Sequence, residues 1–320
     1  MTPEPGNFIT QPLYRLSSPL FYLMGIFAVA LGYISGQTPM VWIQLQQVKK
    51  YKLGSEEVSR FLETNDFSIL HLNANTGLLL MLCMFIGAWL GYLFFLRLSK
   101  IPLLKTITLR IQFDWSRYLF GFGVWMLLTI LVEIIFYINK PEIYHWRFDA
   151  DNFIILLLIG ISLVPVQAAL EEVFFRGFVL QGLFATSKKI GLSLLISTLF
   201  FSMVHSMNPE IEKYGFWTMQ VYYLGAGLFL AFLGLADNGL ELSMGIHAAT
   251  NVFGSVLLKY EGSVLQTQTL VEQKLVNPWP MIFTFYLSAA IMWWLCSKKY
   301  GFSLSRALEV KKSKDEPIIS

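Results

Sequence analysis

Apolar residues along this chain fall into blocks of about 20, and polar and charged residues lie mostly between the blocks. A helix of this length is what is needed to cross the hydrocarbon core of a bilayer. The pattern therefore predicts an all-α fold, a polytopic membrane helix bundle with about eight transmembrane helices. The expected spans centre near residues 20–38, 75–96, 118–138, 155–182, 190–207, 216–235, 239–258 and 278–297.

The block between Asp151 and Lys188 is too long for one straight span and too short for two. Pro165 lies inside this block, and proline lacks the amide hydrogen that a helix interior requires. We expect Pro165 either to kink a helix or to start one.

No repeat and no separate soluble domain is visible in the pattern, and 46–74 is predicted as the only sizeable polar loop. Residues 1–150 are expected to hold the N-terminal transmembrane helices and this loop. Residues 151–260 are expected to form a catalytic core, and 261–320 to form the last transmembrane helix and a basic tail. Gly32/Gly36 and Gly87/Gly91 have the spacing of small residues that lets membrane helices pack closely.

The composition agrees with a membrane protein, because 14% of the residues are charged whereas soluble domains carry roughly 25%. The net charge of +3 gives no reason to expect a nucleic-acid partner; the expected surroundings are a lipid bilayer. Basic residues at span ends mark the cytoplasmic side. They gather in the loop after the second span, at the Lys188–Lys189 turn and in the C-terminal tail. Both termini are therefore predicted to be cytoplasmic, with loops 139–152 and 207–215 outside.

Several residues with possible chemistry have a simpler interpretation. Cys83 and Cys296 lie in apolar runs and are interpreted as small buried side chains, not as a disulfide. His71 and His145 are expected at the surface. Glu133 lies near the outer end of its span and is expected to be interfacial.

Three ionisable residues stand out in the run VPVQAALEEVFFRGF: Glu171, Glu172 and Arg176. Ionisable groups at membrane depth cost at least about 2.5 kcal/mol each, so they generally mark function. Glu172 and Arg176 are one helical turn apart and are predicted to pair. Glu171 points about 100° away and needs a partner from another part of the fold.

Two histidines in apolar runs could meet this carboxylate. His205 ends one run, and His247 shares a polar helix face with Ser243 and Asn251. On a helical hairpin about the Lys188–Lys189 turn, Glu172 and His205 would both lie about 24 Å from the turn. A meeting of these residues in an intramembrane catalytic cavity is therefore predicted.

The residue types suit peptide hydrolysis by an activated water. A carboxylate and an imidazole, Glu171 and His205, can together deprotonate the water. His247 and Asn251 can donate hydrogen bonds to the oxyanion that develops. No cofactor is expected, although zinc bound by Glu171, His205 and His247 stays open as an alternative; no HExxH spacing supports it.

Three motifs resemble those of the CPBP/Abi intramembrane protease family, also called type II CAAX prenyl endopeptidase-like. EEVFFR (Glu171–Arg176) is similar to the family's EExxxR, FSMVH (Phe201–His205) to FxxxH, and HAATN (His247–Asn251) to HxxxN. The motifs occur in the family's order, within roughly 155–257.

The resemblance implies an eight-helix fold with a conical, cytosol-facing cavity. It also implies that Glu171 activates water with His205, that His247 and Asn251 form the oxyanion site, and that Glu172 and Arg176 are structural. Eukaryotic members remove the last three residues of prenylated CAAX proteins, whereas many bacterial relatives act in bacteriocin processing, self-immunity, peptide signalling or sensor regulation. The compact chain is more typical of a bacterial inner-membrane member, for which a prenylated substrate is not expected.

The leading interpretation is thus an intramembrane endopeptidase acting on a membrane-embedded or membrane-anchored peptide or protein. A non-catalytic scaffold or regulator of a sensor protein is the second. A proton-coupled transporter that uses the buried Glu and His residues is the third, although the repeated half-structure typical of transporters is not apparent.

Overall fold

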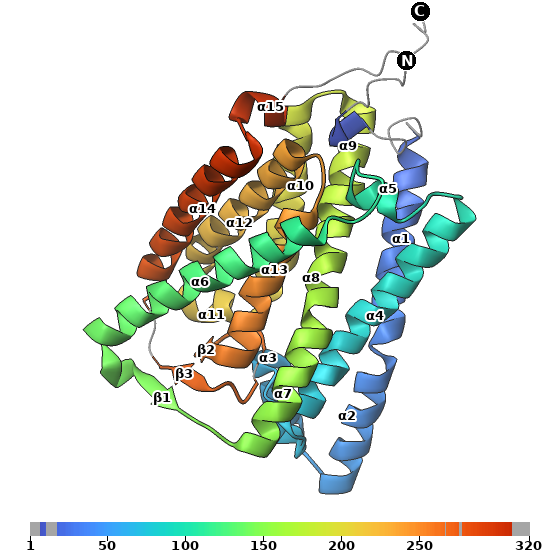
Figure 1. The fold of residues 1–320 in the computed structure, drawn as a ribbon. Helices are drawn as coiled ribbons and strands as arrows, with labels where there is room; N and C mark the ends of the chain where they lie inside the picture. Colours follow the sequence, from blue (N-terminus) through green and yellow to red (C-terminus); the bar gives the residue numbers. More distant parts are fainter. Residues whose placement is uncertain (1–6, 11–17, 266, 275–276, 309–320) are drawn as a thin grey trace, which may run out of the picture.

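The chain folds as a bundle of long helices with one small sheet at one end (Figure 1). The computed structural model describes residues 7–10, 18–265, 267–274 and 277–308. Within this part, seven helical runs are long and apolar enough to cross a membrane. They are Pro19–Tyr51, Ala74–Leu98, Trp115–Asn139, Ala150–Ser187, Ile190–Met207, Phe216–Asp237 and Pro278–Tyr300. The predicted polytopic helical membrane bundle is confirmed.

The individual helices are those labelled in Figure 1. The longer ones are α1 (Pro19–Gly36), α2 (Thr38–Tyr51), α4 (Ala74–Leu98), α6 (Trp115–Asn139), α7 (Ala150–Ser162), α10 (Ile190–Val204), α12 (Phe216–Asp237), α13 (Glu241–Val252) and α14 (Pro278–Tyr300). The shorter ones are α3 (Ser55–Thr64), α5 (Leu104–Ile107), α8 (Val164–Glu172), α9 (Gln181–Ser187), α11 (Pro209–Tyr214) and α15 (Leu304–Leu308).

The predicted seventh span, 239–258, does not form a helix long enough to cross a membrane. It forms α13, a helix of 12 residues, continued by π-helical turns over Phe253–Leu257. Nearly every α13 side chain is buried, because α6, α8 and α12 pack around it. A helix enclosed by protein has no contact with lipid that would set its length, so α13 is a central helix shorter than a span.

The segment 46–74, predicted as a polar loop, is mainly helical. The helix α2 continues to Tyr51, α3 follows, and a 3₁₀ turn covers Phe67–Leu70. The Glu57 carboxylate accepts a hydrogen bond from the amide of Gly54, which caps the start of α3. The apolar side of α3 then packs on the start of α4 through Phe61. A mixed-charge sequence therefore forms a surface helix here.

The long run Ala150–Ser187 is broken once, at Leu163 between α7 and α8. Pro165 lies in the first turn of α8, where its missing amide hydrogen leaves no hydrogen bond unmade. The expected start of a helix at Pro165 is confirmed.

The first and fourth helices pack through the predicted glycine positions. A Cβ atom on Gly87 would overlap the carbonyl oxygen of Gly32, and a Cβ atom on Gly36 would overlap that of Cys83. The two backbones are thus in direct contact, as small-residue spacing predicts. Cys83 is half-buried, Cys296 is buried, and both are free thiols, as expected.

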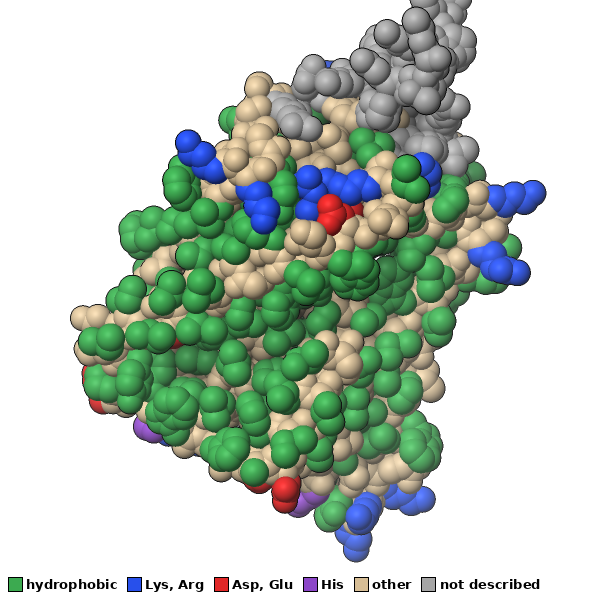
Figure 2. Space-filling view, viewed as in Figure 1, with side chains coloured by type: hydrophobic (Ala, Val, Ile, Leu, Met, Phe, Trp, Pro, Cys, Tyr) green, Lys and Arg blue, Asp and Glu red, His purple; other side chains and the backbone are tan. Residues whose placement is uncertain are grey.

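The two ends of the bundle differ. One end carries the α9–α10 turn, the α4–α6 connection and the end of α14. The other carries α11 and the sheet, in which β3 (Val271–Gln273) lies between antiparallel β1 (Tyr144–Trp146) and parallel β2 (Leu258–Tyr260). Figure 2 shows a broad apolar surface between an edge rich in Lys and Arg and an edge of mixed charge.

Candidate active site

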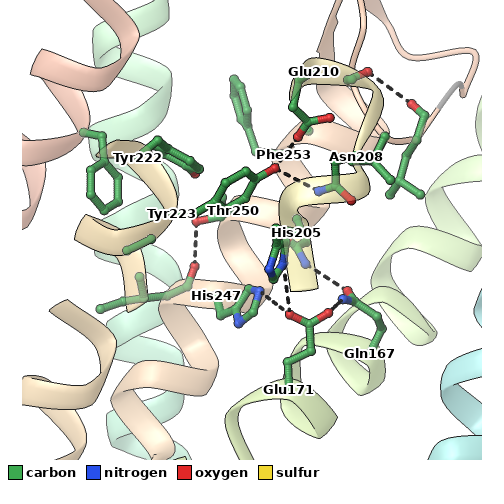
Figure 3. Close-up of a pocket in the computed structure, with 18 of the residues that line it drawn as sticks. Gln167, Glu171, His205, Asn208, Glu210, Tyr222, Tyr223, His247, Thr250 and Phe253 are labelled. Carbon is green, nitrogen blue, oxygen red and sulfur yellow. Dashed lines mark hydrogen bonds and ion pairs between the residues drawn. The ribbon is translucent and has the colours of Figure 1, made fainter. Parts of the chain in front are cut away.

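The carboxylate of Glu171 lies in the last turn of α8 and faces two imidazoles (Figure 3). Its Oε2 is 3.8 Å from Nε2 of His205 and 3.7 Å from Nε2 of His247. This oxygen is buried and has no hydrogen-bond partner within the described residues. An unpartnered buried carboxylate oxygen at these distances leaves a position that one water can bridge.

His205 lies where α10 ends, and its ring is held from two sides. Its Nδ1 is 2.7 Å from the carbonyl oxygen of Phe201, one turn earlier. The Tyr223 ring stacks on the imidazole, with centroids 4.6 Å apart. Because a carbonyl only accepts, Nδ1 carries the hydrogen, and in the neutral imidazole the lone pair of Nε2 faces Glu171.

His247, on α13, is oriented by the second carboxylate of the pair. Its Nδ1 is 2.7 Å from Oε1 of Glu172, and the same oxygen is 2.8 Å from Nη1 of Arg176. Arg176 also donates to the carbonyl oxygen of Gly227 at 3.1 Å. Both members of this pair are buried, so the predicted Glu172–Arg176 ion pair is confirmed as a contact inside the protein.

Both helices that supply these residues change to π-helical turns directly after them. In the first run the π turns cover Val173–Leu180, beginning after Glu172; in α13 they begin at Phe253, two residues after Asn251. π turns insert an extra residue and are frequent at functional sites. They rotate the downstream helix surface relative to the carboxylates. The apolar sequence of these segments gave no indication of them.

Asn251 contacts a residue that the sequence reasoning missed. Its Nδ2 donates to Oε1 of Gln167 at 2.8 Å, and Nε2 of Gln167 donates to Oε1 of Glu171. Asn251 and Gln167 therefore fix one oxygen of the carboxylate. The available signal was that Gln167 precedes Glu171 by four residues, one turn of the same helix.

A second polar group beyond His205 was also missed. The Tyr223 hydroxyl donates to Oε1 of Glu210 and accepts from Nδ2 of Asn208, at 2.9 Å for the latter. Glu210, on α11, is only 3% exposed, and burial raises the pKa of its carboxyl. These contacts fix the aromatic ring on which His205 stacks.

These groups line one large cavity of about 1330 Å³. Glu171, His205, His247 and Asn251 all line it, whereas Glu172 and Arg176 lie behind its wall. Most of the wall is apolar and comes from α1, α4, α6, α12 and α14. The four residues proposed from the sequence are therefore brought together in one cavity.

The cavity extends from the site toward the end of the bundle that carries the sheet. Its wall there includes Asn208, Lys140, Leu258 and Gln273. Among the other residues considered from the sequence, Glu133 lines the cavity and accepts a hydrogen bond from the Tyr144 hydroxyl at 2.8 Å. The remaining histidines do not line it: His71 is exposed, as expected, and His145 is half-buried in β1.

The site was also tested for a metal. In the part of the chain that the structure describes, no group of three His, Cys, Asp or Glu side chains is arranged to hold a metal ion. Glu171, His205 and His247 therefore do not form a three-ligand metal set.

Comparison with known proteins finds a family match in the central part of the chain. Residues 151–253 match a family described as type II CAAX prenyl endopeptidase Rce1-like. The chain is similar to the uncharacterized protein YyaK of Bacillus subtilis (strain 168), with 35% identity over 180 residues. These are 56% of this chain and 58% of YyaK, so the match spans little more than half of that relative. No solved structure matches the chain.

Proposed function

We propose that this chain is an intramembrane endopeptidase, because residues 151–253 match the type II CAAX prenyl endopeptidase Rce1-like family. It hydrolyses a peptide bond of a membrane-associated peptide or protein with a water activated by Glu171 and His205. The observation that carries this proposal is the buried, unpartnered Oε2 of Glu171, which faces the Nε2 atoms of two imidazoles.

A water between Oε2 of Glu171 and Nε2 of His205 would be held by two acceptors. It donates one hydrogen to Oε2 of Glu171 and the other to Nε2 of His205, so its oxygen lone pairs stay free for the substrate. Since both acceptors are bases, either can take the proton as the oxygen attacks. The same geometry that orients the water therefore also activates it.

The proposed reaction balances with water as the only co-reactant. The Glu171–His205 pair takes a proton from water while the oxygen bonds to the scissile carbonyl carbon. The tetrahedral oxyanion accepts hydrogen bonds from Nε2–H of His247 and from the second amide hydrogen of Asn251. The C–N bond then breaks, and the proton taken from water passes to the leaving amine.

The residues behind the cavity wall hold this arrangement. Glu172 fixes the ring of His247 by accepting a hydrogen bond from its Nδ1. Arg176 in turn balances the charge of Glu172. Gln167 keeps the other oxygen of Glu171 occupied, so that Oε2 faces the site.

The substrate class follows from the surroundings of the site. A cavity with mainly apolar walls inside a membrane bundle suits a peptide segment that is embedded in the bilayer or anchored to it. The similarity to a Bacillus protein favours a bacterial cell membrane. The proposal requires no metal, no cofactor and no prenyl group.

The test compares the N-termini that peptide-bond cleavage creates in the membrane fraction of cells. One set of cells expresses the unmodified chain and the other expresses Glu171→Gln. We expect a set of new N-termini on membrane proteins or peptides that disappears in Glu171→Gln and in His205→Ala. It should persist in Glu142→Gln, an exposed carboxylate outside the cavity. Identical sets from all four chains, each confirmed to be folded by size-exclusion chromatography, would refute proteolysis.

The same variants separate the alternatives. A proton-coupled transporter would lose ion flux in proteoliposomes with Glu171→Gln and would produce no new N-termini. A regulatory scaffold would keep its partner with Glu171→Gln and would also produce none.

A further inference from the structure

Glu210, at the start of α11, is a buried carboxylate that no cation of the described chain neutralises. The acidic side chains that are buried within the described residues are Glu172, Glu210, Asp237 and Glu241. Each of the other three forms an ion pair with an arginine, Arg176 or Arg110. No ion pair between described residues involves Glu210. A buried carboxylate is costly unless a cation compensates its charge, so Glu210 can accept a cation from outside the chain.

The cation that could have neutralised Glu210 is turned away from it. Lys213 follows Glu210 by three residues on the same helix, a spacing at which opposite charges can pair. Its Nζ lies instead 2.7 Å from Oε2 of Glu261, and neither member of that pair lines the cavity. The carboxylate of Glu210 therefore stays without a counter-charge beside the cavity.

One oxygen of Glu210 is held and the other is available. The side chain lines the cavity and is only 3% exposed. Its Oε1 accepts a hydrogen bond from the Tyr223 hydroxyl, whereas Oε2 is buried and has no hydrogen-bond partner among the described residues. Burial raises the pKa of this carboxyl, and a cation bound beside it favours the ionised form. Oε2 is thus an acceptor that a group in the cavity can use.

The surroundings of Glu210 suit a positive charge. Tyr222, Tyr223 and Tyr260 line the cavity as well, and the rings of the first two have centroids 5.4 Å apart. After burial, the charge of Glu210 is the next cause that raises the pKa of the Tyr260 hydroxyl, so this ring also lies within its field. Aromatic faces attract ammonium and guanidinium groups. The formal charges in the cavity lining are three carboxylates, Glu133, Glu171 and Glu210, against the single cation Lys140.

Glu210 lies one aromatic ring away from the proposed catalytic pair. The Tyr223 ring stacks on His205 with centroids 4.6 Å apart, and its hydroxyl is bonded to Glu210 (Figure 3). An extended peptide covers about 3.3–3.6 Å per residue. A side chain within about three residues of a bond held at Glu171 can therefore reach Glu210.

We propose that Glu210 binds an ammonium or guanidinium group of the substrate, from a Lys or Arg side chain near the scissile bond. This rests on the proposed function for the reaction itself, and it narrows the substrate to a membrane-associated segment with a basic residue at a fixed distance from the cleaved bond. Such a side chain fits the cavity in both parts, because its apolar stem packs on the apolar wall while its charged end meets the carboxylate.

Binding is tested first, without catalysis. The purified chain in micelles of a non-ionic detergent is unfolded thermally with dodecylamine, which carries an ammonium group at neutral pH, or with 1-dodecanol, which is neutral. Glu210→Gln removes the charge and keeps an oxygen that can accept from Tyr223. Glu212→Gln is the matched control, because it removes one charge from an exposed position of the same helix outside the cavity.

We expect dodecylamine to raise the unfolding temperature of the unmodified chain and of Glu212→Gln more than 1-dodecanol does, since a ligand of the folded state stabilises it. This extra shift should be lost in Glu210→Gln. Equal shifts in Glu210→Gln and Glu212→Gln, or no extra shift in any chain, would overturn the proposal.

The sequences around the new N-termini give the second test. We expect Lys or Arg to be enriched at one position within about three residues of the cleaved bond. In Glu210→Gln this enrichment should fall by about tenfold or more relative to Glu212→Gln, the change that loss of one charge-assisted hydrogen bond gives. A displaced His205 would instead lower cleavage at all bonds alike and leave the enrichment unchanged.

The two tests separate this proposal from the proposed function. An enrichment that is the same in Glu210→Gln and Glu212→Gln, or no enrichment, would refute the cation site and leave proteolysis intact. The expected dodecylamine shifts without any new N-termini would refute proteolysis and leave the cation site at Glu210 intact.

Discussion

The buried Glu172–Arg176 pair allows a stringent test of how this core is stabilised. Arg176→Met removes the guanidinium and leaves Glu172, which is 0% exposed, with His247 as its only partner within the described residues. Removing one member of a buried ion pair costs about 3–5 kcal/mol, because the other charge stays buried without compensation. The guanidinium also lies 4.3 Å from the centre of the Phe201 ring. We therefore expect a loss of about 3–5 kcal/mol in the free energy of unfolding.

A matched pair on the surface provides the control. Lys213 and Glu261 are 2.7 Å apart, but their side chains are 29% and 55% exposed. Exposed pairs contribute about 0–1 kcal/mol, since water solvates either charge when the other is removed. Lys213→Met should thus change the free energy of unfolding by less than about 1 kcal/mol.

Denaturant titration of the purified protein in detergent micelles measures both variants under one condition. The double variant Glu172→Gln/Arg176→Met removes both charges and should regain part of the stability lost in Arg176→Met. If Arg176→Met loses no more free energy of unfolding than Lys213→Met, the Glu172–Arg176 pair is not desolvated and the expected loss is refuted. If the double variant is no more stable than Arg176→Met, the loss comes from packing and not from an uncompensated charge.

Three further outcomes are expected. Gly87→Val should destabilise the protein by about 1–3 kcal/mol, because its side chain meets the Gly32 backbone; thermal unfolding should show no such loss for Gly123→Ala, where a Cβ meets nothing within 4 Å. Burial raises the pKa of the Glu210 carboxyl in the folded protein above its value in the unfolded chain. The protonated carboxyl therefore stabilises the fold at pH values below the unfolded pKa, and this stabilisation is lost as the pH rises through the folded pKa. The thermal unfolding temperature of Glu210→Gln should depend less on pH than that of the unmodified chain. Finally, the metal chelator 1,10-phenanthroline should leave the production of new N-termini unchanged. Loss of the new N-termini in its presence would indicate that cleavage needs a metal.

The architecture and the meeting of the motifs were predictable for separate reasons. The length of each apolar block matches the thickness of the bilayer core. Seven of the predicted spans are therefore found as helical runs at the predicted positions. The contact between Glu171 and His205 follows from counting residues on both sides of one tight turn, since helices rise by about 1.5 Å per residue. Such arguments need only helix geometry.

The features that were missed depend on tertiary packing. The shortness of α13 arises from its enclosure by α6, α8 and α12, which no local pattern encodes. The role of Glu210 depends on α11 folding back so that Tyr223 contacts both Glu210 and His205. Neither of these is a property of a single segment.

Two adjacent glutamates thus occupy different environments because one residue along a helix is a rotation of about 100°. Glu172 turns inward to Arg176, and Glu171 turns to the cavity with one oxygen unpartnered. His247 joins them, since its Nδ1 contacts Glu172 while its Nε2 lies 3.7 Å from Glu171. The buried ion pair therefore positions a ring of the site itself. On the proposed mechanism, a change at Arg176 alters cleavage as well as stability, whereas a change at Glu171 abolishes cleavage and leaves the fold intact.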